Sequence, residues 1–327
     1  MKKIILFCLI STLIFLTACG DNTTTPSKNS NALTVYTTVY PLTYFTERIG
    51  GNKVNVNSVY PAGSDEHTFD PTQQDMMALA DADLFFYIGL GLEGFVNSAQ
   101  KTLANENVTM IATANAVSDE ELEGDHHEDE SHHEHEDESH AEEGHEGHDH
   151  GEIDPHLWIS PQLSKELALS IKESLIEKDP KNEETYAQNF EKLVSELDEL
   201  DHAYKEMADS SVNKTFFVSH AAFGYLASTY GLEQVAVAGL NSQDEPSQKE
   251  LTDIVEEAKE KNITTILFEQ NVSSNLAKVI QNEIGAQALT MHNLGVLTQQ
   301  DIDQNETYFT LMEQNLKTLQ KALQSSN

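Results

Sequence analysis

Three histidines lie where a parallel α/β sheet places its ligand-binding residues. His67 follows a predicted strand that ends at Tyr60, His156 directly precedes a predicted helix, and His220 ends the predicted strand TFFVSH. Because ligands of open α/β sheets bind at the carboxyl ends of the strands, these three side chains could converge. Three neutral imidazoles suit a zinc ion, with Zn–N bonds of about 2.0–2.1 Å. Spacing alone leaves open that each is a hydrogen-bonded structural histidine.

Nine of the 14 histidines lie in one acidic segment, residues 119–152. This segment holds 17 Asp+Glu, no Lys or Arg and no apolar periodicity, so it cannot bury a core and we expect it to be disordered. Its imidazoles and carboxylates predict weak binding of several zinc ions. Because only neutral imidazole binds a metal, this weak binding should be lost below about pH 6. The alternative is a variable acidic insertion with incidental metal affinity. The nine are His126, His127, His132, His133, His135, His140, His145, His148 and His150.

Two further histidines are outside that segment. His202 falls on the polar side of a long predicted helix, which indicates a solvated side chain. His292 follows a predicted strand and is a further candidate ligand.

The elements that must position these residues alternate between strand and helix, which predicts parallel βαβ units. A stripe of apolar residues at spacings of three and four over residues 183–208 predicts a single helix about 39 Å long, which could join two α/β lobes. Strands are predicted at 33–40, 54–60, 83–88, 108–112, 215–218, 234–238, 265–268 and 288–291. Helices are predicted at 42–49, 71–80, 92–103, 161–177, 183–208, 221–230, 247–261, 274–284 and 306–323.

The N-terminus has the pattern of an export signal over residues 1–18. Two lysines precede an apolar run that is too short to span a bilayer. Its end, LTAC at 16–19, resembles a bacterial lipobox, which implies that Cys19 is acylated and anchors the mature chain to membrane lipid. Residues 19–32 are polar and non-periodic, as expected of a flexible tether.

The charge balance excludes some classes of partner. The chain of 327 residues has 19 Lys+Arg against 55 Asp+Glu, a formal net charge of −36. Such a surface repels phosphate backbones, so we exclude generic nucleic-acid binding, and it cannot dock onto anionic lipid through basic residues.

Six segments carry a family resemblance that covers nearly the whole mature chain. Through them the chain resembles the zinc-specific solute-binding lipoproteins of bacterial ABC transporters, a cluster that also has manganese-binding members. The acidic, histidine-rich insertion is typical of the zinc branch. The segments are VYTTVYPL at 35–42, PAGSDEHTFDPT at 61–72, DLFFYIGLGLEGF at 83–95, DPHLWISP at 154–161, FFVSHAAFGYLASTYGL at 216–232 and LFEQNVSS at 267–274.

The resemblance implies an α/β fold of two (β/α)4 lobes joined by a single long rigid helix, with the metal site in the cleft between the lobes. We expect the N-terminal lobe at 33–181, with the disordered insert at 119–152 inside it. The linking helix is expected at 182–210 and the C-terminal lobe at 211–327.

The same resemblance implies that His67, His156 and His220 are metal ligands. Manganese-binding members tend to have a carboxylate at the position of His220, and nitrogen ligands favour zinc over manganese, which prefers oxygen. Many members supply a fourth ligand, a carboxylate, where this chain has Gly295. The fourth position is therefore open between water and Glu66, whose alternative role is that of a solvated loop carboxylate.

Two more carboxylates are expected to orient imidazoles rather than bind metal. Glu269 follows a predicted strand and Asp154 lies two residues before His156. A carboxylate bonded to the second ring nitrogen of a ligand histidine fixes its orientation. For Asp154 the alternative is capping of the helix that follows.

These features predict a binding protein and not an enzyme. We expect it to capture Zn²⁺ outside the cytoplasm, anchored to the cell membrane, and to deliver the ion as a monomer to an ABC permease and its ATPase. The alternatives are a manganese-uptake protein, a surface adhesin or metal buffer, and a zinc hydrolase. Three histidines plus water also describe a catalytic zinc site, but the chain has no HExxH motif.

Overall fold

The computed structural model describes residues 32–123, 153–244, 246–270 and 274–324. The predicted export signal, the predicted acylation site Cys19 and the nine clustered histidines lie outside the described residues. In the described ranges, no helix is both long enough and apolar enough to cross a membrane.

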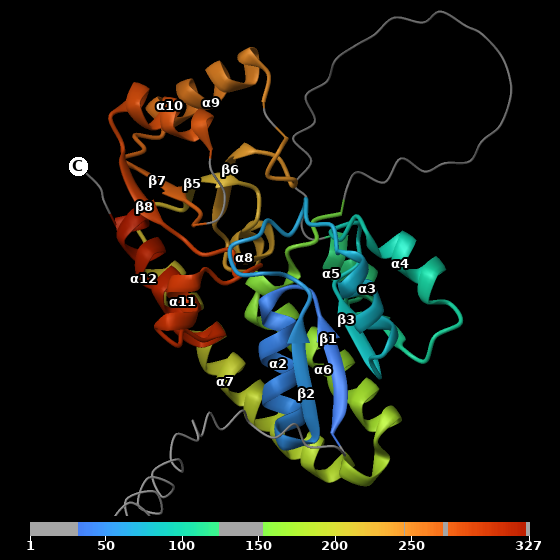
Figure 1. The fold of residues 1–327 in the computed structure, drawn as a ribbon. Helices are drawn as coiled ribbons and strands as arrows, with labels where there is room; N and C mark the ends of the chain where they lie inside the picture. The colour runs from blue at the N-terminus through green and yellow to red at the C-terminus, as the bar shows by residue number, and fades with distance from the viewer. Residues whose placement is uncertain (1–31, 124–152, 245, 271–273, 325–327) are drawn as a thin grey trace, which may run out of the picture. The chain divides into compact units, whose positions relative to one another are not determined.

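The first half of the chain builds a parallel four-stranded sheet with the order β2-β1-β3-β4 (Figure 1). Strand β3 is buried along its whole length because its sequence, LFFY, is apolar on both faces. This is expected of an inner strand covered on both sides. The strands are β1 (Leu33–Thr37), β2 (Val54–Ser58), β3 (Leu84–Tyr87) and β4 (Thr109–Ala112).

The second half repeats the design with the order β6-β5-β7-β8, again all parallel. Both sheets therefore place their first strand inside and their second at an edge, which confirms the predicted fold of two parallel α/β lobes. The strands are β5 (Thr215–His220), β6 (Glu233–Ala238), β7 (Thr265–Phe268) and β8 (Gln287–Thr290).

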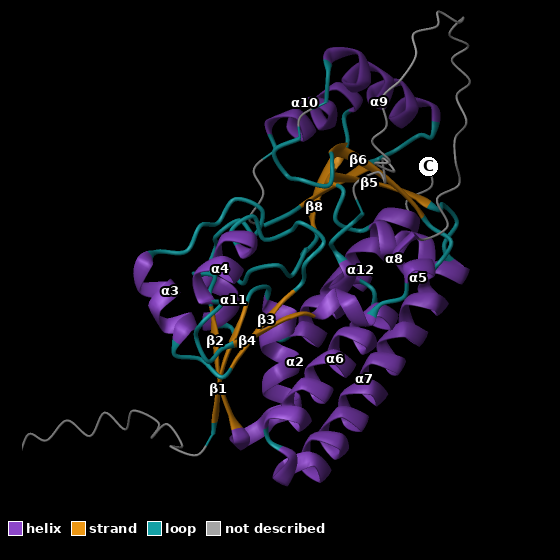
Figure 2. Ribbon diagram, turned by 90° about the vertical axis from the view of Figure 1, so that its right-hand side faces the viewer, coloured by secondary structure: helices purple, strands orange, loops and turns teal. Residues whose placement is uncertain are grey.

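Helices cover both faces of each sheet, as Figure 2 shows. On the first sheet, α2 (Tyr40–Gly50), α6 (Pro161–Lys178) and α7 (Glu183–Ser210) lie on one face. The other face carries α3 (Gln73–Ala80) and α4 (Val96–Leu103). On the second sheet, α9 (Gln248–Glu260) and α10 (Asn275–Ile284) lie opposite α8 (Gly224–Thr229) and α12 (Tyr308–Gln324). Two short helices complete the described chain, α5 (Asp119–Glu123) and α11 (Gln299–Asp303).

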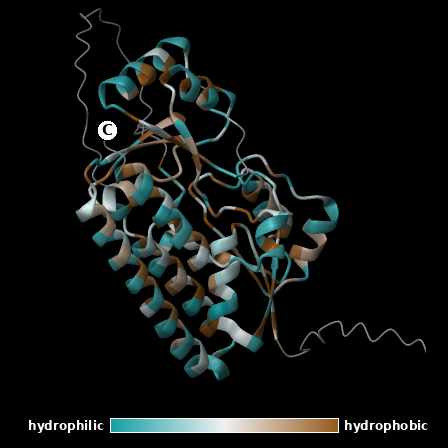
Figure 3. Ribbon diagram, turned by 90° about the vertical axis from the view of Figure 1, so that its left-hand side faces the viewer, coloured by the Kyte–Doolittle hydropathy of each residue, from teal (hydrophilic) through white to brown (hydrophobic). Residues whose placement is uncertain are grey.

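The long helix α7 packs against helices of both halves of the chain. It has 28 residues, hence a length of about 42 Å. It contacts α2 and α6 on one side and α12 on the other, where the Tyr204 hydroxyl donates to the carbonyl of Met312 at 2.8 Å. Apolar and polar residues alternate along the helices of this bundle (Figure 3). The predicted apolar stripe is confirmed, and its buried residues on α7 are Tyr186, Leu193, Leu197, Leu200, Tyr204, Met207 and Ala208.

The core beneath α7 gives a stability prediction. Leu197 is fully buried in the main apolar cluster. Leu197→Ala should therefore lower the free energy of unfolding by about 2–5 kcal/mol, since it removes buried methyl groups and leaves a cavity. The control is Glu199→Ala on the exposed side of the same helix, which should change it by no more than about 0.5 kcal/mol. Denaturant unfolding of the two variants measures the difference, and equal effects would show that this part of α7 is not a packed core.

Several sequence predictions differ from the structure. The strand predicted at 33–40 ends at Thr37, and Tyr40 begins α2. The helix predicted at 221–230 spans Gly224–Thr229, and α11 was not predicted.

The helix predicted from residue 92 begins at Val96, and the chain before it turns at Gly89, Leu90 and Gly91, which all have positive φ. The Glu93 carboxylate accepts the backbone N–H of Gly89 at 3.0 Å and holds this turn.

The segment 119–152, predicted to be disordered, begins with the helix α5. Ser118 caps this helix: its hydroxyl accepts the N–H of Glu121, and the Glu121 carboxylate accepts the N–H of Ser118. The prediction of disorder was therefore wrong for 119–123, where a capping box starts a helix.

Candidate metal centre

Three loop and strand-end positions bring the predicted histidines together. His220 is the last residue of β5, and His67 lies in the loop that follows β2. His156 precedes a short 3-10 helix, Leu157–Ile159, that leads into α6. One ring nitrogen from each of the three lies within 4.8 Å of the other two. Among the described residues, this is the single group of three or more His, Cys, Asp or Glu with such spacing.

The distance between two of these nitrogens fits a tetrahedral ion. Nε2 of His67 and Nε2 of His156 are 3.3 Å apart. Two nitrogen ligands of a tetrahedral zinc ion with Zn–N bonds of about 2.0–2.1 Å lie about 3.3–3.4 Å apart. The pair therefore needs little movement to share such an ion.

Burial keeps the first of these imidazoles neutral. His156 and His220 are fully buried and His67 is partly buried. Burial, together with the neighbouring imidazoles of His156 and His220, lowers the pKa of His67 to about 3. The ring is then uncharged at physiological pH, which is the form that binds a metal.

His220 is held by acceptors on both ring nitrogens. Its Nδ1 lies 3.0 Å from Oε2 of Glu269, and its Nε2 lies 3.1 Å from the carbonyl oxygen of Leu240. Burial alone would lower the pKa of His220, but the charge and hydrogen bonds of Glu269 outweigh it and raise the pKa to about 9. A metal that takes Nε2 must therefore displace a proton and the Leu240 carbonyl.

Asp154 and Glu269 each lie within hydrogen-bond distance of one of the three histidines. Oδ1 of Asp154 lies 2.7 Å from Nδ1 of His156, which leaves Nε2 facing His67. The Glu269 carboxylate, bonded to His220, also accepts the Ser219 hydroxyl at 3.0 Å. The alternative for Asp154 was wrong, because the cap of α6 is Ser160.

Glu66 is buried beside the histidines. It is 2 % exposed, so the alternative of a solvated loop carboxylate was wrong. Burial raises the pKa of Glu66 to about 7. Its Oε1 accepts a hydrogen bond from Nδ2 of Asn293 at 2.8 Å, and Asn293 comes from the segment after β8. Sequence reasoning missed both Asn293 and the Leu240 carbonyl, since neither has a residue type typical of metal sites.

The other histidines in the described chain do not join this group. His202 on α7 is exposed and pairs with Glu206, as its place on the polar face predicted. His292 is buried, but it belongs to no group of potential ligands and its backbone is bonded on both sides by the Asn315 amide.

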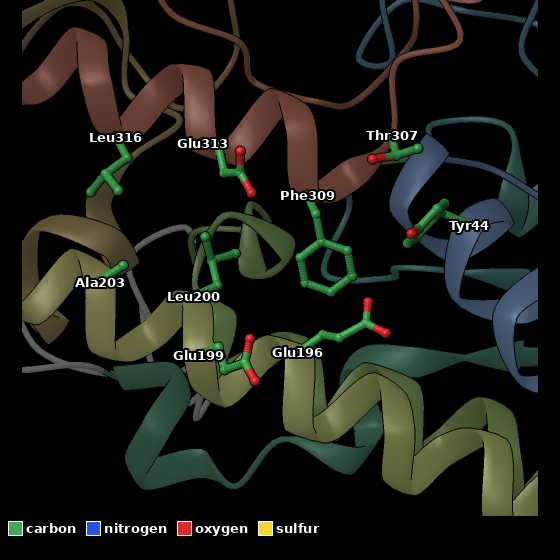
Figure 4. A pocket seen from close by; sticks show the side chains of 9 residues that line it. All are labelled: Tyr44, Glu196, Glu199, Leu200, Ala203, Thr307, Phe309, Glu313 and Leu316. Carbon is green, nitrogen blue, oxygen red and sulfur yellow. The ribbon is translucent and has the colours of Figure 1, made fainter.

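A separate groove of about 490 Å³ lies between α2, α7 and α12 (Figure 4). It is lined by aromatic and aliphatic side chains and by Glu196, Glu199 and Glu313, but by no histidine. Glu196 is already paired with Arg48 at 2.5 Å. The groove therefore lacks the nitrogen donors found at the three-histidine group.

Two parallel α/β lobes, a long helix between them and a group of three convergent histidines define a metal-binding solute-binding protein. Residues 35–322 match the family described as zinc-uptake complex component A, periplasmic. The chain belongs to this family.

Individual relatives agree with this assignment. The high-affinity zinc uptake system protein ZnuA of Bacillus subtilis is 35% identical over 97% of this chain and 97% of its own length. The zinc-binding lipoprotein AdcA of Streptococcus pneumoniae is 35% identical over 98% of this chain, which spans 61% of that longer relative. The crystal structure of the Zn(II)-bound ZnuA-like domain of AdcA has a TM-score of 0.71 at 32% identity, covering 90% of this chain and all of that domain.

A third relative has a second activity in its name. The laminin-binding protein Lmb of Streptococcus agalactiae is described as bifunctional, with adhesin and metal-transporting activity. Its structure has a TM-score of 0.74 at 26% identity and covers 89% of this chain and all of Lmb.

Proposed function

We propose that the protein captures Zn²⁺ outside the cytoplasm and delivers it to an ABC permease driven by its ATPase, with His67, His156 and His220 as the ligands. The observation that carries this proposal is the convergence of three imidazole nitrogens within 4.8 Å, two of them at the spacing of a tetrahedral zinc site. Family membership supports the same role.

The donor set favours zinc over manganese. All three members of the group are imidazoles, and the two carboxylates bonded to them, Asp154 and Glu269, each lie against a ring Nδ1. Imidazole suits zinc, whereas manganese prefers carboxylate, carbonyl and water oxygens. The manganese-uptake alternative therefore has less support.

Glu66 is our choice for the fourth ligand, with water as the alternative. The carboxylate is buried beside the group, and its charge helps to raise the pKa of His220, so the two side chains are close. A buried carboxylate would offset one of the two charges of the incoming ion.

The geometry gives little support to a hydrolase. A zinc hydrolase needs a base free to take a proton from zinc-bound water. Glu269 is bonded to His220 and Ser219, and Glu66 is bonded to Asn293. We therefore propose a binding role without catalysis.

The proposal includes a lipid anchor at the N-terminus of the mature chain and the limits of its two lobes. We propose acylation of Cys19 after removal of residues 1–18, a tether at 19–32 and a monomer held near its permease by lipid. The lobes would span 33–181 and 211–327, joined by the helix within 182–210. The lipid anchor would act by raising the local concentration of the loaded protein at the permease.

Growth of the producing bacterium tests the function. Deleting the gene should stop growth in zinc-depleted medium, and added zinc but not manganese should restore it. A gene copy with both His67→Ala and His156→Ala should fail to complement, whereas His202→Ala should complement. Normal growth of the deletion strain in zinc-depleted medium would contradict the proposal and favour a surface adhesin or metal buffer, the activity paired with transport in Lmb.

The nine clustered histidines are proposed to bind further zinc ions weakly. Replacing all nine by asparagine keeps the length and the formal charge of the segment. We expect the weak equivalents to vanish from a zinc titration while one tight equivalent remains, because the proposed tight ligands, His67, His156 and His220, lie outside this segment. Loss of the tight equivalent would show that this segment, and not the three-histidine group, is the main metal binder.

A further inference from the structure

The Glu66 carboxylate occupies the space that a side chain at position 295 would need. A Cβ added to Gly295 would lie 2.4 Å from Oε1, 2.5 Å from Cδ and 3.0 Å from Oε2 of Glu66. Non-bonded carbon and oxygen atoms do not approach so closely, and no other side chain is among the three atoms nearest to this Cβ. Glu66 is therefore the obstacle to any side chain at this position.

The backbone of Gly295 does not itself require glycine. Gly295 is not one of the glycines with positive φ. Its N–H donates to Oδ1 of Asn293 at 3.0 Å and its carbonyl accepts the N–H of Tyr40 at 2.9 Å. Neither bond involves the missing side chain, so the evident role of glycine here is to leave room for a carboxylate.

Asn293 is hydrogen-bonded to both Gly295 and Glu66. Its Oδ1 accepts from the N–H of Gly295, which fixes the orientation of the amide and turns the NH₂ group toward Glu66. Nδ2 then donates to Oε1 of Glu66 at 2.8 Å. The backbone of Asn293 is fixed as well, because its carbonyl accepts Nε1–H of Trp158 at 2.6 Å, two residues from His156.

We propose that Asn293 is a positioning residue that holds the Glu66 carboxylate at the metal centre, and that the space shared by positions 66 and 295 holds one carboxylate, supplied from either position but not from both. The proposal rests on the proposed function, because it assigns the carboxylate to the zinc site. It makes Asn293, Gly295 and Glu66 one unit that sets the oxygen donor beside the three nitrogens.

Moving the carboxylate tests this exclusivity. Glu66→Ala should weaken zinc binding at least about 10-fold. Adding Gly295→Asp to it should recover most of the loss, since Glu66→Ala frees the space and the carboxyl carbon of aspartate is one bond beyond Cβ. The matched control is Gly295→Asn in the same background, which has the same shape without the charge and should not recover binding. Gly295→Asp alone should lower the melting temperature because both carboxylates then compete for one space.

Exchanging the hydrogen bond tests the positioning role. Asn293→Asp keeps the acceptor for the Gly295 N–H but turns an oxygen toward Glu66, so zinc affinity should fall by about 10–100-fold. Adding Glu66→Gln restores a hydrogen bond with its direction reversed. The melting temperature should then recover while the zinc affinity does not, a split that a purely structural role for Asn293 would not produce.

The outcomes separate this inference from the proposed function. Absence of a tight zinc equivalent in the unaltered protein, or a tight site insensitive to His220→Ala, would overturn the proposed function. A tight site that needs His220, combined with no gain from Gly295→Asp over Gly295→Asn in the Glu66→Ala background, would overturn the inference alone. Unchanged zinc affinity of Asn293→Asp would also overturn it.

Discussion

Replacing His220 by alanine should weaken zinc binding by about three orders of magnitude. This is more than the roughly 10–100-fold loss that is typical when a residue hydrogen-bonded to a metal ligand is replaced. The change removes one of three convergent nitrogen donors and leaves at most two imidazoles for the ion. Competition with a chelator of known zinc affinity would measure the effect. Unchanged tight binding would show that His220 is not a ligand.

Two controls keep this result specific to the site. His202→Ala removes an exposed histidine on α7 and should leave zinc affinity unchanged. The melting temperature of metal-free His220→Ala reports whether the fold survives, since Glu269 loses one partner but still accepts the Ser219 hydroxyl. A folded variant with weak zinc binding is the expected outcome.

Replacing Glu269 by glutamine should change zinc binding in a pH-dependent way. In the proposed site the Glu269 carboxylate, bonded to Nδ1 of His220, orients this ring toward the ion, and loss of such a partner costs about 10–100-fold in affinity. However, the same carboxylate raises the pKa of His220 to about 9, so protons compete with zinc below that pH. At pH 7 this competition lowers the apparent affinity of the unaltered protein by about two orders of magnitude.

The orienting role and the charge of Glu269 have opposite effects on the apparent zinc affinity at pH 7. Without the charge and hydrogen bonds of Glu269 the pKa of His220 falls, although the charge of Glu66 and the Leu240 carbonyl still raise it, so protons compete less with zinc at pH 7. The variant should therefore bind zinc more weakly than the unaltered protein at pH 9 and above, and the difference should shrink or vanish toward pH 7. Zinc affinities between pH 6.5 and 9.5, with proton release measured in two buffers of different ionisation enthalpy, would show this convergence.

An exposed carboxylate supplies the control for this series. Glu256→Gln on α9 should leave both affinity and proton release unchanged at every pH. Parallel pH profiles for the unaltered protein and Glu269→Gln would contradict the role assigned to Glu269.

The charges of the centre explain why it suits a divalent cation. Glu66 and Glu269 are buried at 2 % and 6 % exposure, where carboxylates are costly unless paired or hydrogen-bonded. With its pKa raised to about 9, His220 is protonated at pH 7 in the absence of a metal, and its charge offsets part of theirs. A bound Zn²⁺ would replace that proton with two positive charges beside two carboxylates, which favours the ion over water in the site.

Much of the fold was predictable from local sequence. Apolar runs such as LFFY in β3 and the stripe on α7 reflect burial, so they predicted the elements and their alternation. His220 was predictable as a site residue because it ends a strand, and the carboxyl ends of parallel strands are where ligands bind.

The rest depends on contacts between distant segments. Asn293 reaches Glu66 across 227 residues of chain, and nothing in its residue type signals that bond. The Leu240 carbonyl that accepts from His220 is a backbone group, invisible to any motif. The start of α5 was missed because the acidic composition hid the capping pair Ser118 and Glu121.

A crystal structure of the zinc-loaded protein, with anomalous diffraction at the zinc absorption edge, tests the central claim most directly. We predict one strong anomalous peak bonded to His67, His156 and His220 at about 2.0–2.1 Å, with the Leu240 carbonyl released from His220. A strong peak at any other place, or zinc-loaded protein in which these three imidazoles hold no ion, would contradict the account.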